Sequence, residues 1–200
     1  MTNKPWRGSF AIPMTPYDEN DRIDVDALAA ELAFCVESGV GGIAAPLMVS
    51  EFRSLSETER KLTMKVAVEV SDGRVPIIGN VAAVNTPLAV EYAEYAQSIG
   101  VDGVMAMPPY IHRPDFQRIY AYYKAISDAV SVPVWIQNAN VAALSPDQLV
   151  QLCEEIENVS WVKEEVPPSH KNITAVLSKK SPAIKGVMGG GGGRPMMVEH

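Results

Sequence analysis

Short apolar runs recur along the chain, and the longer segments between them repeat their apolar residues at helical spacing. The runs are brief and rich in bulky side chains, as is typical of parallel strands that are buried on both faces. The pattern therefore predicts parallel strands that alternate with helices. These predicted strands lie within residues 9–14, 41–47, 76–82, 103–109, 133–139, 159–164 and 183–188.

Helix signals fill the segments between the runs. One stripe of apolar residues runs through residues 24–39 and ends at Gly39, a residue that commonly stops a helix. Two serines are followed three positions later by glutamate or glutamine, which is the spacing of a capping box. The stripe consists of Val25, Leu28, Ala29, Leu32 and Val36; the capping boxes are Ser56 with Glu59 and Ser145 with Gln148, the second followed by Pro146; Thr86-Pro87 opens a further helix.

One strand–helix unit repeats along the chain. The segments GVGGI at 39–43 and VDGV at 101–104 introduce two strands alike. Alternation predicts a parallel sheet, and the repetition favours a (β/α)8 barrel of the α/β class over a doubly wound sheet. The glycine run at 188–194 lacks the spacing of a dinucleotide-binding motif. It fits either a flexible loop or a strand end that lies close to a ligand.

The count of strands is one short of a complete barrel. We therefore expect a single barrel domain over residues 1–200 that lacks the eighth strand and the last helices. Without that strand, the first and seventh strands have unpaired edges. An isolated chain of this length is expected to aggregate, to exchange strands, or to need further residues or a partner chain.

Composition excludes several classes of function. The net charge is −7 and the pI is about 5.0, with no concentrated basic face, which argues against nucleic acid as a partner. The polar N-terminus is followed by no long apolar run, so no signal peptide and no membrane span are expected. Cys35 and Cys153 lack metal spacing, which favours a reducing cytoplasm. The three histidines, His112, His170 and His200, are scattered, so no metal site is expected.

A lysine interrupts the sixth apolar run. Residues alternate between the two faces of a strand, so Lys163 and Glu165 share one face. If Val162 packs against the helices, Lys163 points into the barrel at the carboxyl end of the strand, where catalytic residues of such barrels lie. Loss of hydration there favours the neutral amine, which attacks carbonyls. The pattern fits equally well a lysine paired with Glu164 or Glu165.

Five motifs accompany the predicted strands: PMTPY at 13–17, GVGGIAAPLMVSEFRSLSETER at 39–60, VDGVMAMPPY at 101–110, PVWIQNAN at 133–140 and VSWVKEE at 159–165. Together they resemble the dihydrodipicolinate synthase and N-acetylneuraminate lyase group of class I aldolase-type barrels. The resemblance extends from Trp6 to the end of the chain. It implies a (β/α)8 barrel, a Schiff base on Lys163, pyruvate or another 2-keto acid as substrate, no cofactor, and a dimer or tetramer.

The loop after the second strand departs from the family. The usual Gly-Thr-Thr-Gly-Glu segment is Leu47-Met48-Val49-Ser50-Glu51 here. In the family this segment holds the substrate carboxylate, so the resemblance implies binding by the backbone of Val49 and Ser50, with Glu51 nearby. The Ser50 hydroxyl would add one hydrogen bond or would serve only the turn. Glu51, Tyr110 and a water molecule are the candidates for the base that takes a proton from C3.

The family's tyrosine relay is also changed. The strand-five tyrosine is Gln137 here, and the proline three residues later is Asn140. Gln137 is no base near neutral pH, so it is either a substrate contact or a satisfied core amide. The second tyrosine of the relay falls at Tyr110 or Ile111, as a catalytic group or as interface packing. Asn138, Gly189 and Gly190 complete the predicted substrate-binding set.

One branch of the family is similar at these positions. Proteins that act on 2-keto-3-deoxy sugar acids, such as 2-keto-3-deoxyarabonate dehydratase, have the serine–glutamate pair, the Met-Ala-Met-Pro-Pro-Tyr segment and the glutamine. The resemblance implies dehydration through a Lys163 Schiff base and disfavours dihydrodipicolinate synthase activity itself. The alternatives are a retro-aldol lyase, a condensing enzyme, and a barrel that binds 2-keto acids without turnover.

Overall fold

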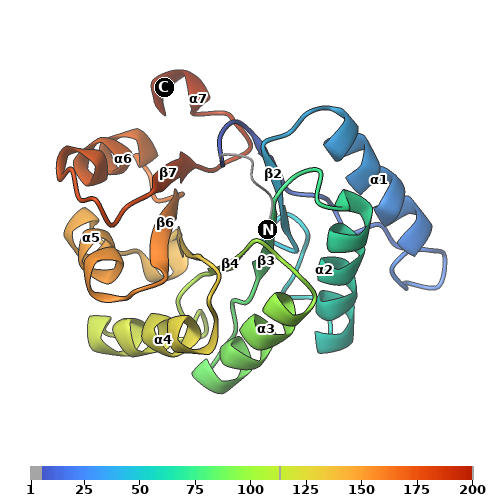
Figure 1. Cartoon of the computed structure of the whole chain (residues 1–200), viewed down its shortest axis with the longest axis horizontal. Coiled ribbons are helices and arrows are strands. Elements are labelled where there is room, and N and C mark those ends of the chain that lie inside the picture. Colours follow the sequence, from blue (N-terminus) through green and yellow to red (C-terminus); the bar gives the residue numbers. More distant parts are fainter. Residues whose placement is uncertain (1–5, 113, 200) are drawn as a thin grey trace. The chain divides into compact units, whose positions relative to one another are not determined.

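The computed structural model describes residues 6–112 and 114–199, so residues 1–5, Arg113 and His200 lie outside the described part. Its seven strands occur in the sheet order β1-β2-β3-β4-β5-β6-β7 and alternate with helices, which confirms the predicted α/β class and seven of the eight strands of a (β/α)8 barrel (Figure 1). The strands are β1 (Phe10–Ala11), β2 (Gly42–Ala45), β3 (Ile77–Asn80), β4 (Gly103–Ala106), β5 (Val134–Asn138), β6 (Val159–Glu164) and β7 (Gly186–Gly189).

The helices fill the predicted segments between the strands. They are α1 (Val25–Glu37), α2 (Glu57–Ser71), α3 (Thr86–Ser98), α4 (Phe116–Ala129), α5 (Pro146–Glu155), α6 (Ser169–Ser178) and α7 (Met196–Glu199), with a short 3-10 helix η1 (Asn140–Ala142). In residues 6–112 and 114–199, no helix is both long and apolar enough to cross a membrane.

The chain divides into two compact units, each described by itself. The first comprises the residues up to 80 and 92–104, and the second comprises 81–91 and the residues from 105 onward. In the first unit β1 pairs with β2, and β2 with β3, in parallel register. In the second unit β5 pairs with β6, and β6 with β7, also in parallel. The expectation of a single domain stays a prediction.

The local helix signals are largely confirmed. Asp24 caps α1, and Gly39 has a φ of +77° just after the helix. Both capping boxes are present, with Ser56 N donating to Glu59 at 2.8 Å and Ser145 N donating to Gln148 at 2.9 Å. Helix α3 begins at Thr86, as predicted, and its capping oxygen belongs to Asn85, which accepts from Leu88 N at 2.9 Å.

Burial is lower at the two outer strands, which were expected to have unpaired edges. Every residue is buried in strands β2, β3 and β5, whereas β1 and β7 are only half-buried. These two strands are the first and last in the sheet order, so each has a neighbouring strand on one side alone. In α1, Leu28, Leu32 and Val36 are buried but Val25, in the first turn, is 40% exposed.

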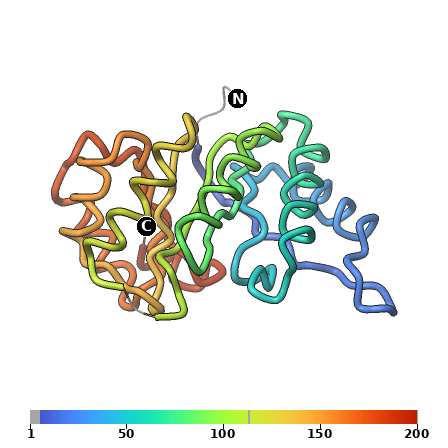
Figure 2. Tube along the Cα trace, turned by 90° about the horizontal axis from the view of Figure 1, so that it is seen from below, coloured from blue at the N-terminus to red at the C-terminus, as the bar shows by residue number. Residues whose placement is uncertain are grey.

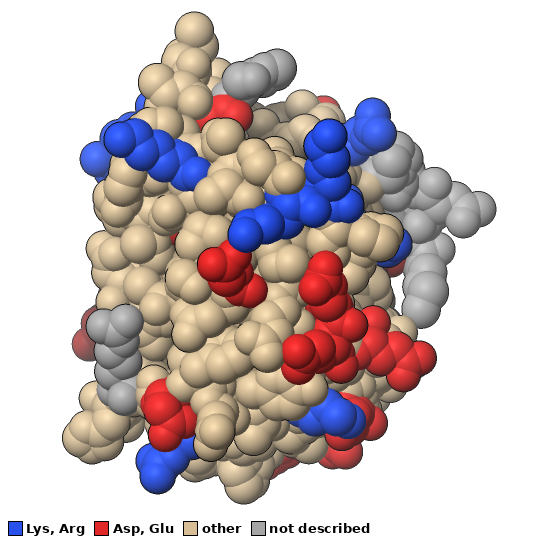
Figure 3. All heavy atoms as spheres, turned by 90° about the vertical axis from the view of Figure 1, so that its left-hand side faces the viewer, with Lys and Arg blue, Asp and Glu red and all other residues tan. Residues whose placement is uncertain are grey.

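In the second unit, helices α5 and α6 pack against β6 and β7. In Figure 2 the part of this unit from β5 to the C-terminus runs from yellow to red. Within it, β5 and β6 pair in parallel. Figure 3 shows both acidic and basic side chains on one face of the molecule, and neither sign covers it. The ion pair between Lys179 and Asp147 at 2.5 Å joins α6 to α5.

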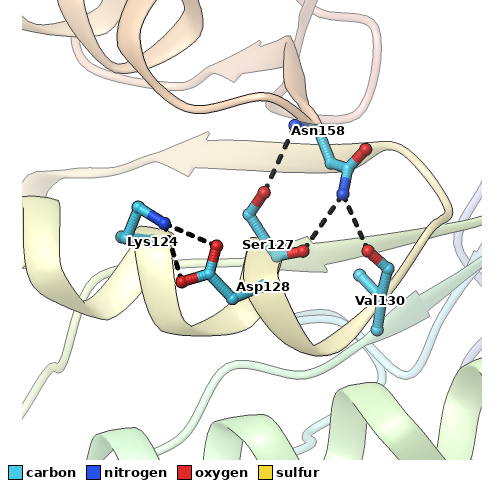
Figure 4. A network of polar contacts seen from close by, with 5 residues as sticks. All are labelled: Lys124, Ser127, Asp128, Val130 and Asn158. Atoms are coloured by element: carbon cyan, nitrogen blue, oxygen red, sulfur yellow. Dashed lines mark hydrogen bonds and ion pairs between the residues drawn. The ribbon is translucent and has the colours of Figure 1, made fainter.

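Asn158 joins the end of α4 to the start of β6. Its backbone N donates to Ser127 Oγ at 3.2 Å, and its Nδ2 donates to the carbonyls of Ser127 at 3.0 Å and Val130 at 2.7 Å (Figure 4). The last carbonyls of a helix lack partners within the helix itself. Asn158 therefore supplies the donors that the end of α4 needs.

Replacing Asn158 by alanine is expected to destabilise the chain by about 1–3 kcal/mol, because carbonyls that lose a donor in a half-buried position are costly. Urea unfolding of the variant and the parent chain measures this difference. Lys124→Ala is the control, because it breaks only an exposed ion pair with Asp128 in the same helix. Equal effects of the two substitutions would contradict the importance of Asn158.

Candidate active site

The register between β5 and β6 places two residue pairs side by side. Lys163 is opposite Gln137, and Trp161 is opposite Trp135. Because side chains alternate along each strand, all four lie on one face of the sheet. The two indole rings stack with centroids 4.7 Å apart and an interplanar angle of 14°. The polar pair at the carboxyl ends of the strands thus stands next to an aromatic layer, while Val162 is fully buried on the other face.

A carboxylate connects the members of the polar pair. Lys163 Nζ lies 3.0 Å from Glu165 Oε1, and the Lys163 side chain is only 4% exposed. Gln137 Nε2 donates to Glu165 Oε2 at 2.7 Å. The sequence allowed Lys163 to pair with either Glu164 or Glu165, and the structure shows the pair with Glu165. A carboxylate in this position can also take a proton from the ammonium group and release the amine as a nucleophile.

Gln137 has one polar atom without a partner. Its side chain is fully buried, and within the described residues its Oε1 accepts no hydrogen bond. A buried carbonyl without a donor is costly, and such groups are rare unless a ligand or water pairs with them. The interpretation of Gln137 as a satisfied core amide therefore does not hold for Oε1. This oxygen is available to a donor on a ligand beside Lys163.

The glycines at the end of β7 make room for acidic side chains. A Cβ atom at Gly190 would overlap the Glu165 side chain, and one at Gly189 would overlap Glu199. Glu199 in turn accepts from Ser169 Oγ at 2.6 Å. The sequence offered, as one interpretation of this glycine run, a strand end that lies close to a ligand. The groups that lie close to its backbone in the structure are the side chains of Glu165 and Glu199. Contact of Gly189 and Gly190 with substrate stays a prediction.

Asn138 lies on the opposite face from Lys163. It is the register partner of Glu164, and its Nδ2 donates to Glu164 Oε2 at 2.7 Å. The structure thus brings Lys163 and Gln137 together but does not bring Asn138 to them. Tyr110 follows β4 in the segment that leads to α4 and is half-buried.

The loop of residues 47–51 belongs to the first unit. Ser50 Oγ donates to Pro13 O at 2.6 Å and accepts from Leu47 N at 3.1 Å, so this fully buried hydroxyl serves the turn. The backbone amides of Val49 and Ser50 donate to no acceptor in the part of the chain that the structure describes. Two such amides suit a carboxylate ligand. Glu51 is exposed and has a φ of +57°.

Metal ligation has no support in the described ranges. No group of three or more histidine, cysteine, aspartate or glutamate side chains could hold an ion within residues 6–112 and 114–199. The free cysteines are Cys35 and Cys153, and burial raises the pKa of the Cys153 thiol to about 12. This thiol is therefore protonated at neutral pH and is no nucleophile.

Residues 5–185 match the Dihydrodipicolinate synthetase family. The chain belongs to this family. Among curated members of the dihydrodipicolinate synthetase family, the 4-hydroxy-tetrahydrodipicolinate synthase of Methanococcus maripaludis is 30% identical over 174 residues, which are 86% of this chain and 60% of the relative. The enzyme of the same name from Bartonella quintana is 29% identical over 161 residues, covering 79% and 55%. The chain thus spans somewhat over half the length of these family members.

A solved structure of the family has the same fold. The chloride-inhibited dihydrodipicolinate synthase from Acinetobacter baumannii, complexed with pyruvate, superposes with a TM-score of 0.87 at 27% identity. The superposition covers 92% of this chain and 64% of that one. The resemblance that the sequence motifs indicated is therefore confirmed at the level of family and fold.

Glu165 is the residue of this site that the sequence did not single out. Its place two positions after Lys163 put it on the same face of the strand, which was the available signal. That signal did not show that its carboxylate reaches both Lys163 and Gln137. The reach depends on the bend of the chain after β6 and on the absence of a side chain at Gly190.

Proposed function

We propose that this protein is a lyase that forms a Schiff base between Lys163 and C2 of a 2-keto acid, and that it dehydrates a 2-keto-3-deoxy sugar acid. The cluster of Lys163, Glu165 and Gln137 carries the proposal, with Glu165 within 3.0 Å of the amine. Family membership supports it, because a relative at 27% identity is described as complexed with pyruvate, which is a 2-keto acid. Homo-oligomer formation and a cytoplasmic location stay predictions.

The first step joins the amine to the substrate. Glu165 takes a proton from the Lys163 ammonium group, and the neutral amine adds to the C2 carbonyl. The resulting hydroxyl on C2 leaves as water after it receives that proton from Glu165. The products are a protonated imine and the Glu165 carboxylate, so no net proton is gained or lost. Binding of a substrate carboxylate by the amides of Val49 and Ser50 stays a prediction.

The second step breaks the bonds at C3 and C4. Glu165 removes a proton from C3, and the electron pair of that C–H bond neutralises the iminium and gives an enamine. The enamine then expels the hydroxyl group from C4, which leaves as water with the proton that Glu165 holds. Hydrolysis of the conjugated imine releases the product and restores Lys163. Glu165 is proposed as this base in place of the candidates from the sequence, Tyr110, Glu51 and a water molecule, because its carboxylate contacts the amine.

Gln137 is proposed to recognise the hydroxyl group that leaves. Its Nε2 is held by Glu165 Oε2, so its Oε1 is the atom that can accept a hydrogen bond from the C4 hydroxyl. A hydroxyl that donates to Gln137 keeps its lone pairs free for the proton on Glu165. The arrangement therefore favours departure of water from C4 and a substrate that is hydroxylated there.

The choice of bond tests the reaction type. Given a 2-keto-3-deoxypentonate, the protein is expected to release water faster than it releases pyruvate and an aldehyde, because Gln137 cannot remove a proton from the C4 hydroxyl as a retro-aldol cleavage requires. Product analysis by NMR measures the ratio. Pyruvate as the main product would promote the aldolase alternative.

A condensing enzyme is the second candidate, since the curated relatives carry the name 4-hydroxy-tetrahydrodipicolinate synthase. Condensation of pyruvate with an aldehyde that exceeds dehydration would favour it over our proposal. An imine that forms without any turnover of the substrate panel would instead favour a keto-acid-binding barrel.

A further inference from the structure

A second polar pair lies behind the Lys163 cluster. Asn138 and Glu164 are register partners, each one residue beyond Gln137 and Lys163 on its strand. Successive side chains of a strand point to opposite faces, so this pair stands on the face away from Lys163. Both side chains are completely buried. Any ligand of the Lys163 cluster is therefore on the other side of the sheet from Asn138.

Each oxygen of the Glu164 carboxylate accepts a hydrogen bond. Asn138 Nδ2 donates to Oε2 at 2.7 Å, and Val166 N donates to Oε1 at 2.7 Å. Burial raises the pKa of Glu164, while these hydrogen bonds lower it in part. A buried carboxyl group needs such donors, so the pair ties the ends of β5 and β6 to each other.

Asn138 has no polar side-chain atom left for a substrate. Its Nδ2 also donates to Leu144 O at 3.1 Å, and its Oδ1 accepts from Leu144 N at 2.8 Å. Leu144 ends the segment that contains η1 and precedes the cap of α5. The amide therefore fastens three parts of the chain, namely the end of β5, the end of β6 and the loop before α5.

The same contacts fix the backbone on both sides of Glu165. Glu165 N donates to Asn138 O at 2.9 Å, and the next amide, Val166 N, is held by the Glu164 side chain. The peptide units that flank Glu165 thus have little freedom to rotate. Its carboxylate is thereby directed to Lys163 Nζ at 3.0 Å and Gln137 Nε2 at 2.7 Å.

We propose that Asn138 and Glu164 are positioning residues that direct the Glu165 carboxylate toward the reacting atoms at Lys163. The inference rests on the proposed proton transfer by Glu165, and it replaces the predicted role of Asn138 as a substrate ligand. A positioning role predicts that the two steps of the reaction respond differently. Water can replace Glu165 as the proton carrier of imine formation, whereas removal of the C3 proton needs an oriented carboxylate.

The test compares these two steps in the full chain with pyruvate as the probe. Borohydride trapping reports the imine on Lys163, and exchange of the pyruvate methyl hydrogens in D2O reports proton removal from C3. Glu164→Gln keeps the shape but has one acceptor oxygen, so it cannot accept from both Asn138 Nδ2 and Val166 N, and it is expected to slow exchange about 10- to 100-fold. Trapping is expected to stay within a factor of about three, well below that loss. Glu154→Gln, an exposed position on α5, is the matched control.

Rescue distinguishes positioning from simple loss of stability. Adding Asn138→Asp to Glu164→Gln restores an amide–carboxylate pair with the donor and acceptor exchanged, although Leu144 O still lacks its donor. Part of the exchange rate is expected to return. Asn138→Ala alone keeps the Glu164 carboxylate and gives an independent variant, which is expected to show the same separation of the two readouts.

Two results would overturn the positioning role. One is exchange at the parental rate in both Glu164→Gln and Asn138→Ala. The other is a parallel loss of trapping and exchange without any rescue, which would indicate a purely structural pair. The variant Glu165→Gln tests the proposed function separately. Exchange at the parental rate in that variant would show that Glu165 does not take the proton from C3.

Discussion

Lys163→Arg is expected to abolish the covalent adduct that borohydride traps between the protein and pyruvate or a 2-keto-3-deoxy acid. A guanidinium group stays protonated and cannot condense with a carbonyl, even though it can still pair with Glu165. In the parent chain, the mass of the reduced imine should appear on the peptide that holds Trp161 to Glu165. Mass spectrometry of the digested protein measures both outcomes.

A second lysine serves as the control for this result. Lys185 is exposed at the start of β7 and donates to Pro182 O at 2.8 Å, so Lys185→Arg should leave the adduct unchanged. Modification of Lys185 in place of Lys163 would refute the assignment of the Schiff base. Loss of the adduct in both variants would point to a general defect of the fold, which a thermal transition would reveal.

Glu165→Gln is expected to separate imine formation from proton removal. The amide keeps the size of the side chain but cannot accept a proton from C3, so exchange of the pyruvate methyl hydrogens should fall about 100- to 10,000-fold. The trapped adduct on Lys163 should still accumulate at equilibrium, since the amine is present and water can carry the proton that Glu165 carries during imine formation. Exchange followed by NMR and trapping followed by mass spectrometry give the two quantities from one sample.

The control for Glu165 is a glutamate without contact to the site. Glu154→Gln changes an exposed helical position and should leave both readouts at the parental level. An exchange rate in Glu165→Gln close to that of the parent would mean that another group removes the proton. Tyr110 and Glu51, the candidates from the sequence, would then be the next to replace.

The sequence was sufficient for the alternation of strands and helices, because each depends on local spacing. Apolar runs located β2 to β6, and the spacing of serine to glutamate or glutamine located the starts of α2 and α5. The motif around Lys163 indicated the family, which the match over residues 5–185 shows. All of these features depend on residues that are close together in the sequence, so they can be predicted without the tertiary structure.

Contacts across strands were decided by the tertiary structure. The sequence grouped Asn138 with Gln137 as a substrate ligand and left Glu165 as one possible partner of Lys163. The register of β5 against β6 puts Asn138 opposite Glu164 on one face and Gln137 opposite Lys163 on the other, where the Gln137 side chain donates to Glu165. A hydrogen bond of 2.7 Å between side chains 28 positions apart depends on register and rotamer, and apolar periodicity specifies neither.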